Sequence, residues 1–197
     1  ELLHASYTLA KRYFMKSICC VGLLLLSFQC TLSAQSMDCL RGDCDSGHSL
    51  AVFSNGNRYE GDFAAGQPHG LGAMAFPNGD EYYGNFYRQY RQGKGRMKFN
   101  NGDHYFGDFY EDEMQGVGTM NYTNGGRYEG EWFVGVPHGN GVLHTGSGDE
   151  YRGAFASGMF HGRGIMRYAD GSMYEGQWQY SQKHGRGKLI TQSGRIQ

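Results

Sequence analysis

Four histidines recur at one position of a regular pattern, and their type and spacing raise the question of a metal site. They are His69, His138, His161 and His184, separated by multiples of 23 residues. Imidazole is a common zinc ligand, but two nitrogens bound to one zinc ion lie within about 4 Å of each other. If each 23-residue unit contributes two strands to a sheet, equivalent positions in successive units lie about 10 Å apart. We therefore predict no metal or cofactor, and expect these side chains to hydrogen-bond to loop backbone.

A cluster of cations is the second candidate for chemistry. It comprises Arg88, Arg91, Lys94, Arg96 and Lys98. The next unit carries four carboxylates, at Asp108, Glu111, Asp112 and Glu113. One interpretation is that neighbouring units form exposed ion pairs, which contribute little stability. The other is that the cluster contacts anionic lipid phosphate or an acidic protein partner.

Motifs of known enzymes are missing from the pattern. The recurrent Gly-x-Gly pairs lack the Gly-Lys-Ser/Thr of a phosphate-binding loop, and no Gly-x-Ser-x-Gly nucleophile elbow occurs. The formal net charge is −1, so the chain lacks the basic surplus typical of nucleic-acid binding. The sequence predicts a protein that is not an enzyme and does not bind nucleic acid.

The positions of all these residues are governed by a 23-residue repeat that starts at Tyr59. Each unit has a tyrosine, a glycine two residues later, and a large aromatic residue two further on. The repeat-defining residues are Tyr59, Gly61, Phe63, Tyr82, Gly84, Phe86, Tyr105, Gly107, Phe109, Tyr128, Gly130, Trp132, Tyr151, Gly153, Phe155, Tyr174, Gly176 and Trp178. A fixed period of this length indicates an array in which each unit is one supersecondary element stacked on its neighbours.

Within each unit, residues of similar character alternate along the chain, which predicts two short strands. Tyr59, Gly61 and Phe63 share one face of the first strand, and Gly72 shares a face of the second with Met74. Asn-Gly and similar dipeptides favour tight turns from each unit to the next, whereas the loop inside a unit is expected to be longer. The predicted fold is all-β: an elongated single-layer antiparallel meander of six hairpin repeats, with glycines that leave room for neighbouring rings.

The first 34 residues have the organisation of a leader. Residues 15–34 contain a lysine, an apolar run at 18–28 and small residues up to Ala34, which predicts a secretory signal peptide cleaved after Ala34. Residues 1–14 are then an upstream extension with no structural role. The expected location is secreted or periplasmic at the cell envelope. An uncleaved signal anchor and a lipoprotein at Cys30 remain as alternatives.

Residues 35–58 are predicted to form a degenerate half-repeat that caps the sheet. Cys39 and Cys44 flank a short turn-forming segment, so a disulfide is expected in an oxidising compartment. The alternatives are two free thiols or half of a metal site.

The segments Tyr-Glu-Gly-Glu-Trp at 128–132 and Tyr-Glu-Gly-Gln-Trp at 174–178 resemble the MORN (membrane occupation and recognition nexus) repeat. The resemblance extends over residues 59–197, although Gln92 and Gln115 replace the histidine of other units. It implies a sheet of hairpins and a role as scaffold, dimerisation device or tether, and binding of phospholipid headgroups is often proposed for this family.

The function predicted from these features is an exported, non-catalytic scaffold that mediates protein association through an exposed apolar stripe. Its protein partner is not identified by the sequence, and a homodimer is possible. Peripheral membrane binding through the basic cluster is the alternative, and an enzyme accessory module is a third, less favoured one.

Overall fold

The computed structural model describes residues 36–196. The predictions for the leader at 15–34 and for the extension at 1–14 fall outside this range.

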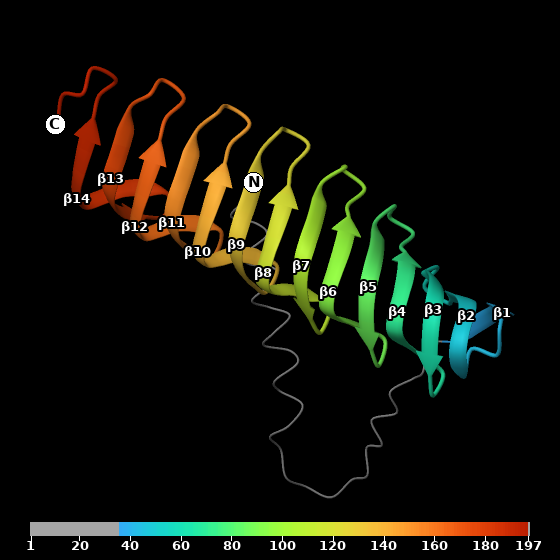
Figure 1. Ribbon diagram of the computed structural model, residues 1–197. Helices are drawn as coiled ribbons and strands as arrows, with labels where there is room; N and C mark the ends of the chain where they lie inside the picture. The colour runs from blue at the N-terminus through green and yellow to red at the C-terminus, as the bar shows by residue number, and fades with distance from the viewer. Residues whose placement is uncertain (1–35, 197) are drawn as a thin grey trace, which may run out of the picture. The chain divides into compact units, whose positions relative to one another are not determined.

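The described residues form one sheet of 14 antiparallel strands that follow one another in chain order (Figure 1). The strands are β1 Met37–Arg41, β2 Ser46–Phe53, β3 Arg58–Ala64, β4 Gln67–Ala75, β5 Glu81–Tyr87, β6 Tyr90–Lys98, β7 His104–Tyr110, β8 Glu113–Asn121, β9 Arg127–Phe133, β10 Val136–His144, β11 Glu150–Ala156, β12 Met159–Arg167, β13 Met173–Gln179 and β14 Gln182–Ile190. Each 23-residue unit from Tyr59 onward supplies one hairpin, so the predicted all-β, single-layer antiparallel meander is confirmed.

The relative lengths of the turns differ from the prediction. The turn inside a unit contains only two residues, as at Ala65-Gly66 between β3 and β4, and both have positive φ, 50° and 71°. The connection between units is the longer one, spanning residues 76–80 between β4 and β5. There Gly79 takes a positive φ, whereas Asn78 is not in the left-handed region and its Oδ1 accepts a hydrogen bond from the Asp80 N–H at 3.1 Å. Asn-Gly therefore forms a wider turn with one left-handed residue instead of a two-residue hairpin.

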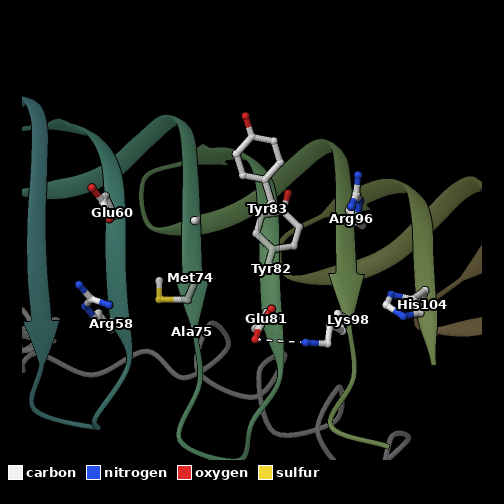
Figure 2. A pocket seen from close by; sticks show the side chains of 11 residues that line it. Arg58, Glu60, Met74, Ala75, Glu81, Tyr82, Tyr83, Arg96, Lys98 and His104 are labelled. Carbon is white, nitrogen blue, oxygen red and sulfur yellow. Dashed lines mark hydrogen bonds and ion pairs between the residues drawn. The ribbon is translucent and has the colours of Figure 1, made fainter. Parts of the chain in front are cut away.

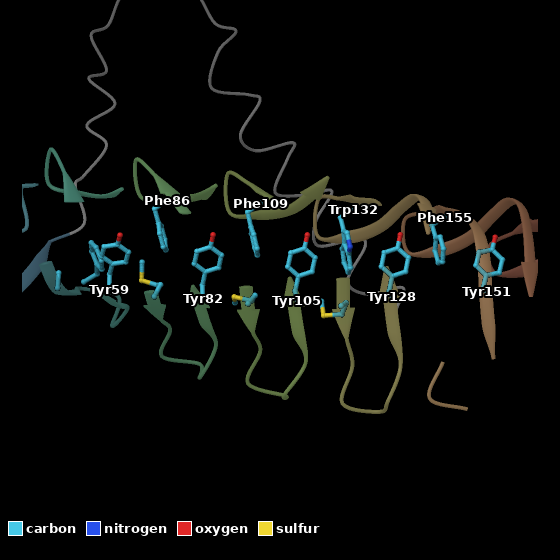
Figure 3. Close-up of a cluster of buried hydrophobic side chains, with 14 of the residues drawn as sticks. Tyr59, Tyr82, Phe86, Tyr105, Phe109, Tyr128, Trp132, Tyr151 and Phe155 are labelled. Carbon is cyan, nitrogen blue, oxygen red and sulfur yellow. The ribbon is translucent and has the colours of Figure 1, made fainter. Parts of the chain in front are cut away.

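Every unit bends sharply in the middle of its hairpin. The ring centroids of Tyr59 and Phe63 are 5.1 Å apart, although four residues of straight strand span about 13 Å. The register between β3 and β4 shifts between Gly61 and Phe63, and Gly70 adopts a φ of 62° at this point of β4. The bend carries the hairpin tips back over the tyrosine rings (Figure 3).

The bend buries a continuous ladder of rings on what we call the inner face. Each of the six tyrosines contacts the large aromatic of its own unit edge-to-face, and the first five also contact that of the next unit. The contacts between units are Tyr59–Phe86, Tyr82–Phe109, Tyr105–Trp132, Tyr128–Phe155 and Tyr151–Trp178, with centroids 5.0–5.4 Å apart. Such pairs contribute about 0.5–1.5 kcal/mol each beyond area burial. The expectation that this apolar stripe would stay exposed is wrong, because these rings are at most 7% exposed.

Hydrogen bonds satisfy the buried phenols. The Tyr59 hydroxyl donates to the Asp62 carbonyl oxygen at 2.9 Å, and Tyr82 donates to Asn85 in the same way at 3.0 Å. Burial raises the pKa of both phenols above its ordinary value, and raises the pKa of Tyr151 to about 12. Tyr59, Tyr82 and Tyr151 therefore stay protonated and act as structural donors.

The paired glycines make room for these rings. Gly61 lies opposite Gly72, and a Cβ added at Gly72 would meet the Tyr59 ring at 2.4 Å. A Cβ at Gly61 would lie 2.5 Å from the Gly72 Cα. The predicted packing of rings over bare backbone is confirmed.

The segment before the first full repeat forms a complete hairpin, β1–β2, and not only one strand. Cys39 in β1 is joined by a disulfide to Cys44, which lies in the connecting loop with its Cα 5.9 Å away. Cys44 is buried and its N–H donates to the Ser49 hydroxyl at 3.2 Å. The disulfide thus ties the loop to β1, and the hydrogen bond to Ser49 ties it to β2, at one edge of the described sheet.

We predict that Gly72→Val lowers the free energy of unfolding by about 3 kcal/mol, because overpacking would displace the Tyr59 ring. The matched control is Ala73→Val, whose added methyl groups would lie on the exposed opposite side of the same strand. Urea denaturation of both variants measures the difference. Equal stability of the two variants would contradict the packing of Tyr59 on Gly72.

Candidate functional site

The predicted basic cluster does not form one surface. Arg91 lies on the inner face with its side chain 19% exposed, and its Nε is 3.2 Å from Asp112 Oδ1. Its guanidinium group also donates to the Asp112 carbonyl oxygen at 2.7 Å and lies 5.5–5.7 Å from the ring centroids of Phe76, Tyr82 and Phe109. Arg91 is therefore part of the core packing, in a position where the preceding unit has Pro68.

The remaining cations lie at the hairpin tip or on the opposite side of the sheet, which we call the outer face. Lys94 pairs with Asp108 at 2.8 Å, and Lys98 pairs with Glu81 at 3.3 Å. Arg88 lies in the β5–β6 turn, 5.3 Å from the centroid of the Tyr87 ring. Within residues 36–196, no carboxylate lies at ion-pair distance from Arg96. Among the described residues, Arg88 and Arg96 are thus the two members of the cluster without a carboxylate at ion-pair distance.

Three of the four recurrent histidines pack against aromatic rings, whereas His184 is exposed. His69 lies 5.2 Å from Tyr87, His138 5.6 Å from Phe133 and His161 6.4 Å from Tyr180, measured between ring centroids. The predicted side-chain hydrogen bonds to loop backbone are not formed in the part of the chain that the structure describes. Among the same residues, no group of three His, Cys, Asp or Glu side chains could hold a metal ion.

Large apolar side chains gather instead on the outer face of β4–β9. We define the outer aromatic surface by its exposed side chains, which are Leu71, Tyr83, Tyr87, Tyr90, Phe106, Tyr110, Val117 and Phe133. Sequence reasoning missed this surface. Its signal was a strand such as Glu81–Tyr87, in which aromatic residues occupy both alternating sets of positions.

Two rows of exposed side chains cross the strands, one on each side of the bend. The middle row places Tyr83 of β5, Arg96 of β6 and Phe106 of β7 directly opposite one another. The tip row consists of Tyr87, Tyr110 and Phe133, each the last residue of its strand and 51%, 52% and 54% exposed. Both rows repeat with the period of the units, so their rings recur at equal steps along the sheet.

A shallow depression of about 320 Å³ adjoins the middle row (Figure 2). Ala73 lies between Glu60 and Tyr83, and Ala75 lies between Arg58 and Glu81, so two small side chains form the floor of the depression. The Tyr83 ring stands above the sheet surface. Arg58 and Arg96 border the depression from opposite sides. The arrangement offers small side chains, flat rings and positive charge, which suits binding of an extended segment.

The fold and this surface define a β-repeat protein with a filled inner face and an outer face that varies from unit to unit. The MORN repeat pattern matches residues 59–81, 82–104, 105–127, 128–150, 151–173 and 174–194. The chain belongs to the MORN repeat family.

Comparison with curated protein sequences found no match. Among solved structures, the chain is similar to the TCP domain of SAS-4 from Drosophila melanogaster, solved in complex with a proline-rich motif of Ana2. That domain is 14% identical, and the match covers 90% of this chain and 96% of that one with a TM-score of 0.50. The wild-type TCP10 domain of CPAP from Danio rerio is 12% identical over 82% of this chain and 87% of its own, with a TM-score of 0.39. The first likeness shows a shared fold; the second is too low to carry an argument.

We predict that Arg91→Met destabilises the protein by about 1 kcal/mol, because it removes a cation that lies beside three rings and pairs with Asp112. Arg96→Met is the matched control and should change stability by less than about 0.5 kcal/mol, as is usual for exposed sites. Thermal and urea unfolding of the two variants test the assignment. If both variants unfolded like the parent protein, the assignment of Arg91 to the core packing would be wrong.

Proposed function

We propose that this protein is a non-enzymatic scaffold whose outer aromatic surface binds another protein. The observation that carries the proposal is the concentration of exposed rings on β4–β9, while the repeat-defining rings are buried beneath them. Contiguous exposed apolar side chains on a folded protein mark interaction sites. The rings are held by strands of one continuous sheet, so the surface is organised before binding.

The comparison with SAS-4 supports a protein partner. The TCP domain of that protein is described in complex with a proline-rich motif of Ana2. A sheet of related architecture can therefore present a binding surface for a peptide segment without a separate binding domain.

Membrane binding through the basic cluster receives less support from the geometry. Arg91 faces inward, and Lys94 and Lys98 are paired with carboxylates of neighbouring strands. Arg96 and Arg88 remain, and two cations contribute only about 2 kcal/mol at an anionic lipid surface. In the part of the chain seen in the structure, no helix is long and apolar enough to cross a membrane.

We also propose that the scaffold acts outside the cytoplasm, at the cell envelope or beyond. The leader pattern at residues 15–34 and the Cys39–Cys44 bond support this location, because such bonds persist in oxidising compartments. Expression of the full chain with a C-terminal tag should yield an exported product that begins at Gln35. N-terminal sequencing would reject the proposal if the product were retained in the cytoplasm with residues 15–34 intact.

Site-specific photo-cross-linking of the full chain in producing cells tests the docking surface. A photoreactive phenylalanine analogue placed at Tyr87, Tyr110 or Phe133 should trap the same protein, identified by mass spectrometry. The control position is Tyr180 in the β13–β14 turn, which is 65% exposed and therefore at least as accessible as the tip row, but should not trap it.

The proposal fails if Tyr180 traps the same product, or if the three tip-row positions trap nothing. A product containing only a second copy of this chain would replace the proposed partner with a homodimer. Purified partner should then bind the parent protein more tightly than the Tyr110→Ala variant.

A further inference from the structure

We propose that the outer face of β11–β14 holds a site for an acidic segment of a protein partner. The site is formed by four cations that we call the β11–β14 basic patch, which are Arg152, Arg163, Arg186 and Lys188. The patch lies on other strands than the outer aromatic surface of β4–β9 (Figure 1). The inference therefore goes beyond the docking function proposed above and does not depend on it.

Charge is distributed unevenly along the sheet. Residues 151–196 contain seven Lys and Arg residues and two Asp and Glu residues, a net charge of +5. Residues 36–150 contain eight Lys and Arg residues and sixteen Asp and Glu residues, a net charge of −8. A surplus of positive charge confined to these strands of an otherwise acidic sheet favours an anionic ligand there.

The four cations lie together, on one side of the bend. They line a shallow depression of about 1050 Å³, in which Glu175 is the only carboxylate among the described lining residues. Arg163 and Arg186 directly follow the left-handed glycines at which β12 and β14 bend, and Lys188 follows two residues later. Arg152 precedes the register shift in β11. One ligand can therefore contact all four cations without crossing the bend.

Most of the patch is not neutralised by the protein itself. Arg152 Nε lies 3.8 Å from Glu150 Oε1, an atom that also pairs with Arg167 at 3.1 Å. Within residues 36–196, no Asp or Glu lies at ion-pair distance from the other three cations of the patch. All four side chains are exposed, so they are accessible to a ligand.

Comparison of equivalent positions explains why these cations are unpaired. Lys94 lies opposite Asp108 on the neighbouring strand and pairs with it at 2.8 Å. Arg163 is the equivalent residue three units later, and it lies opposite Gln177, a neutral amide. The preceding unit carries Ala154 at that position. The carboxylate that pairs with Lys94 therefore has no counterpart beside Arg163.

Gln177 retains the structural role of the carboxylates at equivalent positions. Asp108 Oδ2 accepts a hydrogen bond from the Val117 N–H at 3.1 Å. Gln177 Oε1 accepts one from the Arg186 N–H in the same way at 2.9 Å. The hairpin thus keeps this backbone hydrogen bond, whereas the negative charge that would neutralise the patch is missing.

The extent of the patch favours a ligand with several anionic groups. β11 and β14 are three strand spacings apart, about 14 Å, which exceeds the size of one carboxylate or phosphate group. Guanidinium groups bind carboxylates through two parallel hydrogen bonds, so the three arginines can each hold one acidic side chain. A polypeptide with several Asp or Glu residues meets both requirements.

A planar lipid surface fits the patch less well. Glu129 lies in the same cross-strand row as Arg152, two strands away on the same face. Glu150 lies on that face as well, two residues before Arg152 in β11. A flat anionic bilayer would approach these carboxylates together with the cations, whereas a narrow acidic segment can follow the cations alone.

The test uses the purified full-length protein and synthetic peptides. The probe is a fluorescently labelled peptide of six Glu-Ser pairs, and its binding is measured by fluorescence anisotropy at low salt, where screening is weak. The control peptide contains six Gln-Ser pairs, with the same length and no side-chain charge. We expect the Glu-Ser peptide to bind and the Gln-Ser peptide not to bind.

Two double variants with equal loss of charge test the position of the site. Arg163→Gln/Arg186→Gln should weaken binding of the Glu-Ser peptide by about tenfold, since an exposed ion pair is worth up to about fivefold in affinity. The matched control, Arg127→Gln/Arg167→Gln, removes two cations of the same face that already pair with carboxylates. It should weaken binding by less than about twofold.

A third variant restores the missing carboxylate. Gln177→Glu should pair with Arg163 and Arg186 and weaken binding of the Glu-Ser peptide by about fivefold. Gln182→Glu adds the same charge at the hairpin tip, beyond the bend, and should leave the affinity nearly unchanged. Urea unfolding of each variant checks that the sheet remains folded.

The inference is overturned if the Glu-Ser peptide binds no better than the Gln-Ser peptide, or if the two double variants weaken binding equally. It is also overturned if the Glu-Ser peptide fails to bind while phosphatidylserine vesicles co-sediment with the protein and lose it in the Arg163→Gln/Arg186→Gln variant. That outcome would assign the patch to lipid. Photo-cross-linking at the tip row reports on other strands, so the docking function is judged separately from this site.

Discussion

The structure depends on one contact, repeated in every unit: a tyrosine ring lying on bare glycine backbone. Tyr59 is fully buried, and Gly61 and Gly72 present no side chain to its ring and hydroxyl. The hydroxyl donates to the Asp62 carbonyl oxygen only because the strand bends toward it. Bending then brings Phe63 and Phe86 onto the edges of the same ring, which couples each unit to the next.

This contact divides the sheet into two faces with different constraints. The tyrosine, glycine and large aromatic positions of the inner face must be nearly identical in every unit, because each ring is confined by the units on both sides. The outer face only has to be compatible with a strand, so its composition can vary along the array. Tyr83 and Phe106 thus occupy positions where later units carry Glu129, Arg152 and Glu175. A repeat of this kind can acquire a specific binding surface without a change in its core.

The basic cluster shows how alternation separates residues that are close in sequence. Arg91 precedes the left-handed Gly93 of β6, and its side chain lies among inner-face rings. Lys94, Arg96 and Lys98 follow this glycine on the outer face. Cation–π contacts and the Asp112 pair make Arg91 a structural residue, whereas Arg96 keeps an uncompensated charge beside two exposed rings. The cluster therefore contains a cation that stabilises the core, Arg91, and an exposed cation without a paired carboxylate among the described residues, Arg96.

The sequence by itself determined the repeat, the strand order and the identity of the inner face, because period-2 alternation and the 23-residue spacing leave little freedom in how hairpins pair. It also indicated why Gly72 must lack a side chain. Only the tertiary structure showed that the sheet bends and closes over its own aromatic rings, because the bend arises from a register shift that residue types alone do not specify. For the same reason the sequence pointed to the wrong apolar stripe. The hairpin tips fold back onto one face, so Phe109 is buried there and its neighbour Tyr110 stays exposed.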